Sequence, residues 1–356
     1  MAGRRWAWLA AATLAVIGLA LLPPIQARGK AVALLAEAVG AQLPRPFAPE
    51  IRRREVTLDG VAGHLYVPDR PSPPILLVLG AAPGGPDDPR AVRLARSVAR
   101  TGRVVFAPRL TLADRRFDDA DLDRIVRSVL ALDRLRLTAG PVVMLGISYG
   151  GSYALVASSD PRLAGRVAQV AVFGAYFDLV GVIQAVTTGA SLVDGRLVRW
   201  EGIPSARAIL EEYAIRLAPE ASREDLRAVL GGRGVPAALD RGARAVYELL
   251  ANRDPARTDD LAAALSPDAR SLLARFSPVS VADRIRVPVI ALHSTDDPAV
   301  PYGEAIRLTS HLPQTRLITV RTFRHVDLQT ATGWVGLLAD LWDAWRFASW
   351  LLEPQE

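Results

Sequence analysis

Cysteine is absent from this 356-residue sequence. The chain can therefore form no disulfide or thiolate metal site, has no cysteine nucleophile, and cannot carry the cysteine-linked lipid of a bacterial lipoprotein. The absence leaves the redox compartment open. Lysine occurs once, at Lys30. Because the glycine-rich stretch at residues 80–85 has neither a lysine nor the spacing G-x-x-x-x-G-K-[ST], it does not predict a phosphate-binding loop.

Basic residues do not gather on one element, although the formal net charge is +6. The cations are almost all arginine, and they are interspersed with acids, as Arg124 and Arg127 are with Asp121 and Asp123. Mixed signs of this kind are typical of a solvated face laced with ion pairs. A nucleic-acid-binding surface would concentrate basic residues on one element with interleaved aromatics. We therefore expect no nucleic-acid partner.

An uncharged apolar run covers residues 6–22, after two arginines and before two prolines. As a helix it would be about 25 Å long, close to the roughly 30 Å hydrocarbon core of a bilayer. We expect residues 1–27 to hold an uncleaved membrane anchor, with the folded body outside the cytoplasm. A cleaved signal peptide, giving a secreted protein, is the alternative. A buried helix of a soluble fold is the third possibility.

Residues 28–50 read as a short amphipathic helix, over residues 29–43, followed by a proline-rich linker. From residue 51 onwards, short apolar runs alternate with helical patterns. The predicted strands cover residues 55–58, 63–68, 74–79, 103–107, 142–145, 167–173, 287–293 and 315–322. Such alternation predicts an α/β fold with a largely parallel, doubly wound sheet, formed by residues 51–178 and 277–356.

The alternation stops between residues 179 and 276, where helical patterns follow one another. Glycine-rich and Asn-Arg-Asp-Pro breaks separate them. We expect this insertion to be an all-helical cap over the carboxyl edge of the sheet. After it, the strand pattern resumes, and a final helix is predicted over residues 328–352.

The sequence Gly146-Ile147-Ser148-Tyr149-Gly150 follows a buried strand and precedes a helix. The pattern G-x-S-x-G is common by itself, but between a strand and a helix it predicts a nucleophile elbow. There the serine lies at the apex of a sharp turn, and the helix N-terminus points partial positive charge and free N–H groups at the site.

A serine nucleophile needs a base, and four histidines are available. His64 lies in an early hairpin strand. His293 ends a strand in a position that suits packing, and His311 falls at a helix C-terminus. His325 follows the last strand, in a loop at the sheet edge, so we predict His325 as the base of Ser148.

The acid that orients the base should follow the preceding strand. Two neighbours, Asp296 and Asp297, lie in that loop, and we favour Asp297; Asp327 is a more distant alternative. The resulting chain order, Ser148, Asp297, His325, is the order associated with a G-x-S-x-G elbow on an α/β sheet.

Acyl transfer also needs N–H donors for the developing oxyanion. The backbone N–H of Tyr149, directly after the serine, is one candidate. The other should come from the loop after the strand at residues 74–79, where Ala81 is our first choice and Ala82 the second.

The chain resembles the α/β-hydrolase superfamily from about residue 56 to residue 352. Four features carry the resemblance: GISYGG, the loop LGAAPGG, the run SPVSVADRIRVPVIALHSTDDPAVP, and the histidine after the last strand. Ser148 argues against the dienelactone hydrolases, which use cysteine, and against the dehalogenases and epoxide hydrolases, which use aspartate. The chain has Ser294 where the superfamily commonly has glycine, and Leu79 where it often has histidine. Neither departure removes a catalytic group.

These residues predict a serine hydrolase that cleaves a carboxylic-ester-type bond of a small-molecule acyl substrate. No metal and no organic cofactor is implied. The same residues could serve a peptidase, a thioesterase or an acyltransferase. A catalytically silent binding protein on this fold is a further alternative, and a structural membrane protein with an accidental motif is another. The sequence does not predict the oligomeric state.

Overall fold

The computed structural model describes residues 23–38, 49–116, 118–135, 137–138, 140–321, 323–325, 327–328 and 334–353. Its strands are β1 (Ile51–Leu58), β2 (Val61–Pro68), β3 (Ser72–Val78), β4 (Arg103–Pro108), β5 (Val142–Ile147), β6 (Val167–Phe173), β7 (Ala190–Val193), β8 (Arg196–Arg199), β9 (Val289–Ser294), β10 (Thr315–Val320), β11 (Phe323–Arg324) and β12 (Asp327–Leu328). The helices are α2 (Pro23–Ala38), α3 (Pro89–Arg100), α4 (Asp119–Arg134), α5 (Tyr149–Ser158), α6 (Leu179–Thr188), α7 (Pro204–Ile215), α8 (Arg223–Leu230), α9 (Arg241–Ala251), α10 (Thr258–Ala263), α11 (Pro267–Phe276), α12 (Gly303–His311) and α13 (Trp334–Leu352).

Eight of the described strands form one sheet in the order β1-β2-β4-β3-β5-β6-β9-β10. Strand β2 runs antiparallel to both of its neighbours, and the pairs from β4 to β10 are parallel. The hairpin of β1 and β2 turns at Asp59 and Gly60, both with positive φ (48° and 75°), as a two-residue turn between twisted strands requires. The predicted α/β fold with a largely parallel sheet is therefore confirmed.

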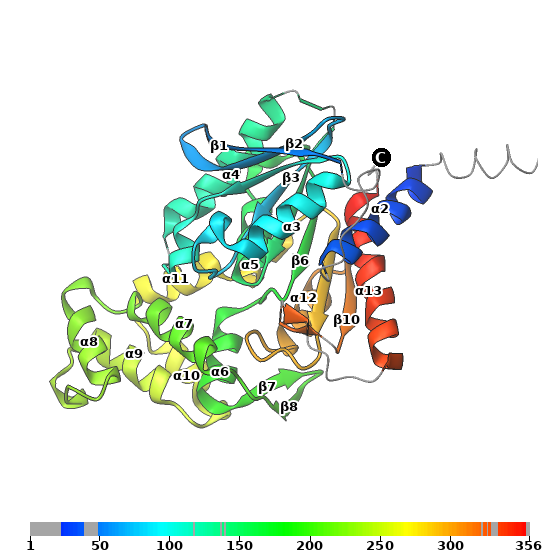
Figure 1. Cartoon of the computed structure of the whole chain (residues 1–356). Helices are drawn as coiled ribbons and strands as arrows, with labels where there is room; N and C mark the ends of the chain where they lie inside the picture. Colours follow the sequence, from blue (N-terminus) through cyan, green and yellow to red (C-terminus); the bar gives the residue numbers. More distant parts are fainter. Residues whose placement is uncertain are drawn as a thin grey trace, which may run out of the picture.

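Side chains of the buried strands alternate between two apolar clusters, one on each face of the sheet. In β3, Leu76 and Val78 belong to the cluster that contains α4 and α5. Ile75 and Leu77 belong to the cluster that contains α2, α3 and α13. Burial on both faces explains why these strands are continuous apolar runs in the sequence, and Figure 1 shows helices on both sides of the sheet.

Helix α2 begins at Pro23, earlier than the amphipathic helix predicted from residue 29. The prolines mark a helix start because the first helical N–H groups have no partner within the helix. The helix also runs across the predicted boundary between residues 27 and 28. It packs against α13 and α3, Trp345 Nε1 donates to Arg28 O at 3.0 Å, and Glu37 pairs with Arg100. Figure 1 shows α2 beside α13.

The predicted membrane segment, residues 6–22, lies outside the described residues. Among the residues that the structure does describe, no helix combines the length and the apolar character needed to cross a membrane.

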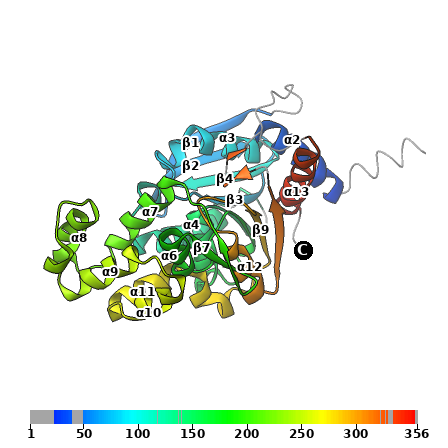
Figure 2. The same cartoon turned by 90° about the horizontal axis from the view of Figure 1, so that it is seen from below.

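The insertion between β6 and β9 is mostly helical, but the prediction of an all-helical cap was wrong. Strands β7 and β8 form an antiparallel hairpin within it. The hairpin turns at Asp194 and Gly195, whose φ values are 47° and 74°. This is the Asp-Gly turn already seen between β1 and β2. Figure 2 shows α8 and α9 projecting away from the sheet.

The final helix is described from Trp334 rather than from residue 328, because Leu328 belongs to the short antiparallel pair β11–β12. This pair follows β10 and includes residues on either side of His325.

A buried carboxylate ties the start of the cap to the core. Glu304 of α12 is 2% exposed, and its Oε2 accepts the N–H groups of Phe177 (3.0 Å) and Asp178 (2.6 Å), where the chain enters α6. Burial raises the pKa of Glu304 to about 7; Asp178 adds to the rise, while Arg307 and the two amides oppose it.

The raised pKa predicts a pH-dependent stability. Since the native state binds the Glu304 proton more tightly than the unfolded chain does, the stabilisation is complete below the ordinary pKa of 4.5 and is lost as the pH rises through about 7. At about 1.4 kcal/mol for each pH unit, wild type should lose up to ~3 kcal/mol over this window relative to Glu304→Gln. Urea unfolding at several pH values measures the difference. The exposed Glu248→Gln serves as the control, and parallel pH profiles for wild type and Glu304→Gln would contradict the expectation.

Candidate active site

Ser148 lies at a sharp turn between β5 and α5. Its φ of 55° and ψ of −134° lie outside the regions that L-residues favour. The backbone holds this conformation from both sides: Ser148 N donates to Phe173 O at 2.7 Å, and Ser148 O accepts from Gly151 N at 2.8 Å.

Glycine is required at the elbow because β5, α5 and β3 approach one another closely there. A Cβ added at Gly146 would lie 2.3 Å from the Cα of Gly151, and one added at Gly150 would lie 2.4 Å from Val78 O. Both distances are too short for a non-bonded contact. The clashing atoms belong to the backbone, so they could not move aside as a flexible side chain can. The two glycines of the G-x-S-x-G pattern are therefore packing requirements of this turn.

His325 bridges the serine and an aspartate. Its Nε2 lies 2.8 Å from Ser148 Oγ, and its Nδ1 lies 2.8 Å from Asp297 Oδ2. A carboxylate only accepts hydrogen bonds, so Nδ1 carries a proton toward Asp297, and Nε2 is the ring nitrogen that faces the Ser148 hydroxyl. The three side chains follow strands β5, β9 and β10, whose carboxyl ends meet at one edge of the sheet.

Asp297 is buried and held from two sides. Its Oδ1 accepts the N–H groups of Ala299 (2.8 Å) and Val300 (2.9 Å). Burial by itself would raise its pKa, but the charge and hydrogen bond of His325, the nearby His293 and the Val300 amide together hold the pKa below its ordinary value. Asp297 is therefore ionised at neutral pH. Its neighbour Asp296 is exposed.

Each of the other three histidines is hydrogen-bonded to a group other than the Ser148 hydroxyl. His293 Nε2 donates to Val300 O at 3.0 Å and lies 3.7 Å from Asp297 Oδ2. Burial lowers the pKa of His293, so the ring is neutral there. His64 is bonded to Asp87, and His311 is exposed at the end of α12, bonded to the carbonyl of Arg307.

The loop after β3 lies against the elbow, as the oxyanion prediction requires. A Cβ at Gly80 would lie 3.0 Å from Ser148 Cβ and 3.1 Å from Tyr149 N. Tyr149 opens α5, so its N–H has no partner within the helix. Ala82 N instead donates to Gly80 O at 2.7 Å. Of the two predicted loop donors, this geometry favours Ala81.

Sequence reasoning missed two residues that contact the His–Asp pair. Trp200, after the cap hairpin, donates its indole N–H to Asp297 O at 2.8 Å. Gly174, with φ of 63°, lies under the pair: a Cβ there would come within 3.0 Å of His325 Nδ1. No pattern at Trp200 signals this contact, because it depends on where the hairpin lies in the folded chain.

The cap also packs on the elbow. The ring of Tyr149 stacks on Tyr213 of α7, with centroids 5.2 Å apart, and meets Tyr176 edge-on at 4.9 Å. Burial raises the pKa of Tyr149. Within the described residues, no cluster of three or more His, Asp or Glu side chains is arranged to hold a metal ion.

No protein-family model and no curated protein matches the chain. Solved structures do. A protein named as a hydrolase from Legionella pneumophila matches with a TM-score of 0.52 at 14% identity, over 92% of this chain and 96% of that one. A rice cell wall degrading esterase from Xanthomonas oryzae matches with a TM-score of 0.51 at 16% identity, over 83% and 87%.

A puromycin-hydrolysing peptidase from Mycobacterium tuberculosis matches with a TM-score of 0.51 at 14% identity, over 86% of this chain. The chain spans 39% of that peptidase's length. At such identities the likeness concerns the fold and carries no substrate. The strand order, the serine elbow between β5 and α5, the cap inserted after β6 and these likenesses together establish that the chain has the α/β-hydrolase fold.

Proposed function

We propose that this protein is a serine hydrolase that cleaves ester-type bonds through an acyl-enzyme intermediate. One observation carries the proposal: His325 lies 2.8 Å from both Ser148 Oγ and Asp297 Oδ2. This is the arrangement of nucleophile, base and orienting acid that acyl transfer to serine needs.

In the first half-reaction, Ser148 Oγ attacks the carbonyl carbon of the ester while its proton passes to His325 Nε2. The ring becomes an imidazolium, which the ionised Asp297 stabilises through the Nδ1–H bond. When the tetrahedral intermediate collapses, the carbon–oxygen bond to the alcohol breaks. His325 returns the proton to the leaving oxygen, and the acyl group stays on Ser148.

In the second half-reaction, water attacks the acyl-enzyme and His325 removes its proton. Collapse of the second intermediate breaks the bond to Ser148 Oγ, and the proton returns to the serine. In both steps the negative charge develops on the carbonyl oxygen, where the N–H groups of Ala81 and Tyr149 would meet it. Oxyanion donors of this kind contribute about 3 kcal/mol each in other hydrolases.

The same steps would cleave a thioester or a peptide, or would pass the acyl group to another acceptor. We choose an ester over a peptide because an ester carbonyl is more electrophilic than an amide carbonyl and an alcohol leaves more readily than an amine. A silent binding protein on the same fold is disfavoured by the direct contact of His325 Nε2 with Ser148 Oγ at 2.8 Å, which a binding role does not need.

The Ser148→Ala variant tests the nucleophile. A fluorophosphonate probe should label Ser148 in wild type, and the variant should lose both the label and ester turnover, by roughly 10⁴-fold or more. Its unfolding curve should stay close to that of wild type. Ser158→Ala, at the other end of α5, is the matched control and should keep both label and turnover. Full turnover by Ser148→Ala would overturn the proposal.

Substitution of the two neighbouring aspartates tests the acid. Asp297→Asn should lower turnover by about 10³- to 10⁴-fold, because an amide at this position can no longer fix the Nδ1–H form of His325 or stabilise the imidazolium. Asp296→Asn should turn over esters at nearly the wild-type rate. Steady-state kinetics on one activated ester measures both, and equal losses would mean that the acid is wrongly assigned.

We further propose that residues 6–22 anchor the protein in a membrane, as their uncharged apolar sequence suggests. Because this run follows a short basic start at Arg4 and Arg5, we place the folded body outside the cytoplasm. Each arginine at the centre of such a segment opposes insertion by about 2.5–3.5 kcal/mol. The double variant Val16→Arg, Ile17→Arg should therefore be lost from carbonate-washed membranes. The control variant Ala2→Arg should remain in the membrane fraction.

The cysteine-free chain allows a direct test of the side. A single Ala339→Cys, exposed on α13, should react with a membrane-impermeant maleimide on intact cells. Protection until the cells are lysed would refute the outside location.

A further inference from the structure

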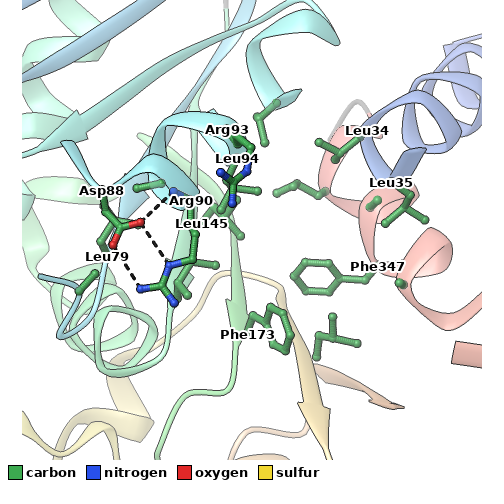
Figure 3. Close-up of a pocket in the computed structure, with 18 of the residues that line it drawn as sticks. Leu34, Leu35, Leu79, Asp88, Arg90, Arg93, Leu94, Leu145, Phe173 and Phe347 are labelled. Atoms are coloured by element: carbon green, nitrogen blue, oxygen red, sulfur yellow. Dashed lines mark hydrogen bonds and ion pairs between the residues drawn. The ribbon is translucent and has the colours of Figure 1, made fainter. Parts of the chain in front are cut away.

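A pocket of about 420 Å³ lies on the α3/α13 face of the sheet. Helices α2, α3 and α13 enclose it, and Figure 3 shows side chains from all three sides. Leucine, phenylalanine and alanine make up most of its lining, among them Leu35 of α2, Leu94 of α3, Leu145 of β5 and Phe347 of α13. The volume falls within the range of small-molecule sites in proteins.

The lining of the pocket includes residues from the segments that hold the nucleophile. Ile147, which lines it, is the residue before Ser148, and Phe173, which also lines it, accepts the Ser148 N–H at 2.7 Å. Ala82, in the loop beside the elbow, is a third lining residue. The apolar space therefore adjoins the carboxyl edge of the sheet where Ser148, His325 and Asp297 lie.

The pocket extends away from this edge. Its lining residues are spread from Asp88 to Val98 at α3 and from Leu341 to Leu351 on α13. Ten residues of helix correspond to about 15 Å. A lining that extends this far along two helices suits a chain-like ligand better than a compact one.

Charged groups occupy one side of the pocket. Asp88 and Arg90 form a double contact at 3.2 Å, and Asp88 also accepts the Arg90 N–H at 2.8 Å. The hydrogen bond from Arg90 holds the pKa of Asp88 below its ordinary value, so the pair is ionised and brings no net charge. Arg93 is exposed on the next turn of α3. Among the described residues, the other lining side chains are apolar.

We propose that this pocket binds the acyl chain of the substrate, so that the substrates are esters of long, unbranched fatty acids. The inference rests on the proposed function for the reaction at Ser148. It adds the part of the substrate that lies beyond the carbonyl.

The first test is the chain-length profile of nitrophenyl esters, in which the leaving group is constant. Each methylene buried in an apolar site contributes about three- to fourfold in affinity or kcat/KM. We expect kcat/KM to rise steeply from butanoate through octanoate to laurate. A flat or falling profile, with butanoate turned over, would overturn the acyl pocket and leave the hydrolase intact.

The second test introduces a larger side chain into the pocket. Ala344 of α13 lines the pocket and is 3% exposed, so Ala344→Phe should lower the laurate-to-butanoate ratio of kcat/KM by about tenfold or more. Ala339→Phe, exposed on the same helix, is the control and should leave the ratio unchanged. Ala344→Phe could instead lower the preference for long-chain alcohols in a series of acetate esters and leave the laurate-to-butanoate ratio unchanged. That result would place the leaving alcohol in the pocket and overturn the proposal.

A binding measurement separates the pocket from the chemistry and does not depend on a filled variant folding. Ser148→Ala protein should bind a fluorescent fatty acid, and laurate should displace it. Binding in the absence of any ester turnover by wild type would support the pocket while the proposed function fails. Failure of the fluorescent acid to bind folded protein would overturn the proposed acyl pocket.

Discussion

The approach of three backbones at the elbow is the constraint on which the site depends. Because Gly146 and Gly151 nearly touch across the turn, and Gly150 meets Val78, the chain can leave β5 and enter α5 within one residue. Ser148 is held at positive φ by this packing and by hydrogen bonds to its own N and O. The backbone strain is confined to Ser148. The regular strand before it and the regular helix after it stabilise the fold enough to offset this strain. The hydroxyl is thereby presented at the sheet edge by backbone packing alone.

The charge of the carboxylates near this hydroxyl depends on burial and on the groups that face their oxygens. Asp297 would be hard to keep ionised in the interior, and it remains so because two amides and His325 face its oxygens. Glu304, equally buried but facing two amides and only one arginine, has its pKa raised instead. The two carboxyls lie at the same edge of the sheet and differ in the groups that compensate them, so one suits a charged role and the other a structural one.

Much of the fold was predictable because buried strands are visible as continuous apolar runs. Strand β6 has the predicted bounds, 167–173, for this reason. The hairpin turning at Asp194 carried the same Asp-Gly signal as the one at Asp59, but its strands have four residues each and β8 is exposed throughout, so no alternation marks them. The start of α2 at Pro23 was misread because a proline pair ends a helix as readily as it begins one.

The candidate site could be predicted as far as chain order and strand ends determine it. Ser148, Asp297 and His325 each follow a strand of the parallel sheet, so the structure brings them together, and their roles stay predictions. The contact of Trp200 and the apolar pocket could not be foreseen, because both depend on how separate elements pack.

The link from Trp200 to Asp297 limits how modular the cap is. The chain enters and leaves the insertion near Asp178 and Ser277, which suggests an exchangeable unit. Yet Trp200 donates to Asp297 O, and Ile203 N donates to Pro298 O at 2.9 Å, so the hairpin end belongs to the acid loop as much as to the cap. Grafting a different cap at the chain ends alone would remove two of the acid loop's hydrogen-bond donors. The natural unit of exchange is the cap together with residues 294–300.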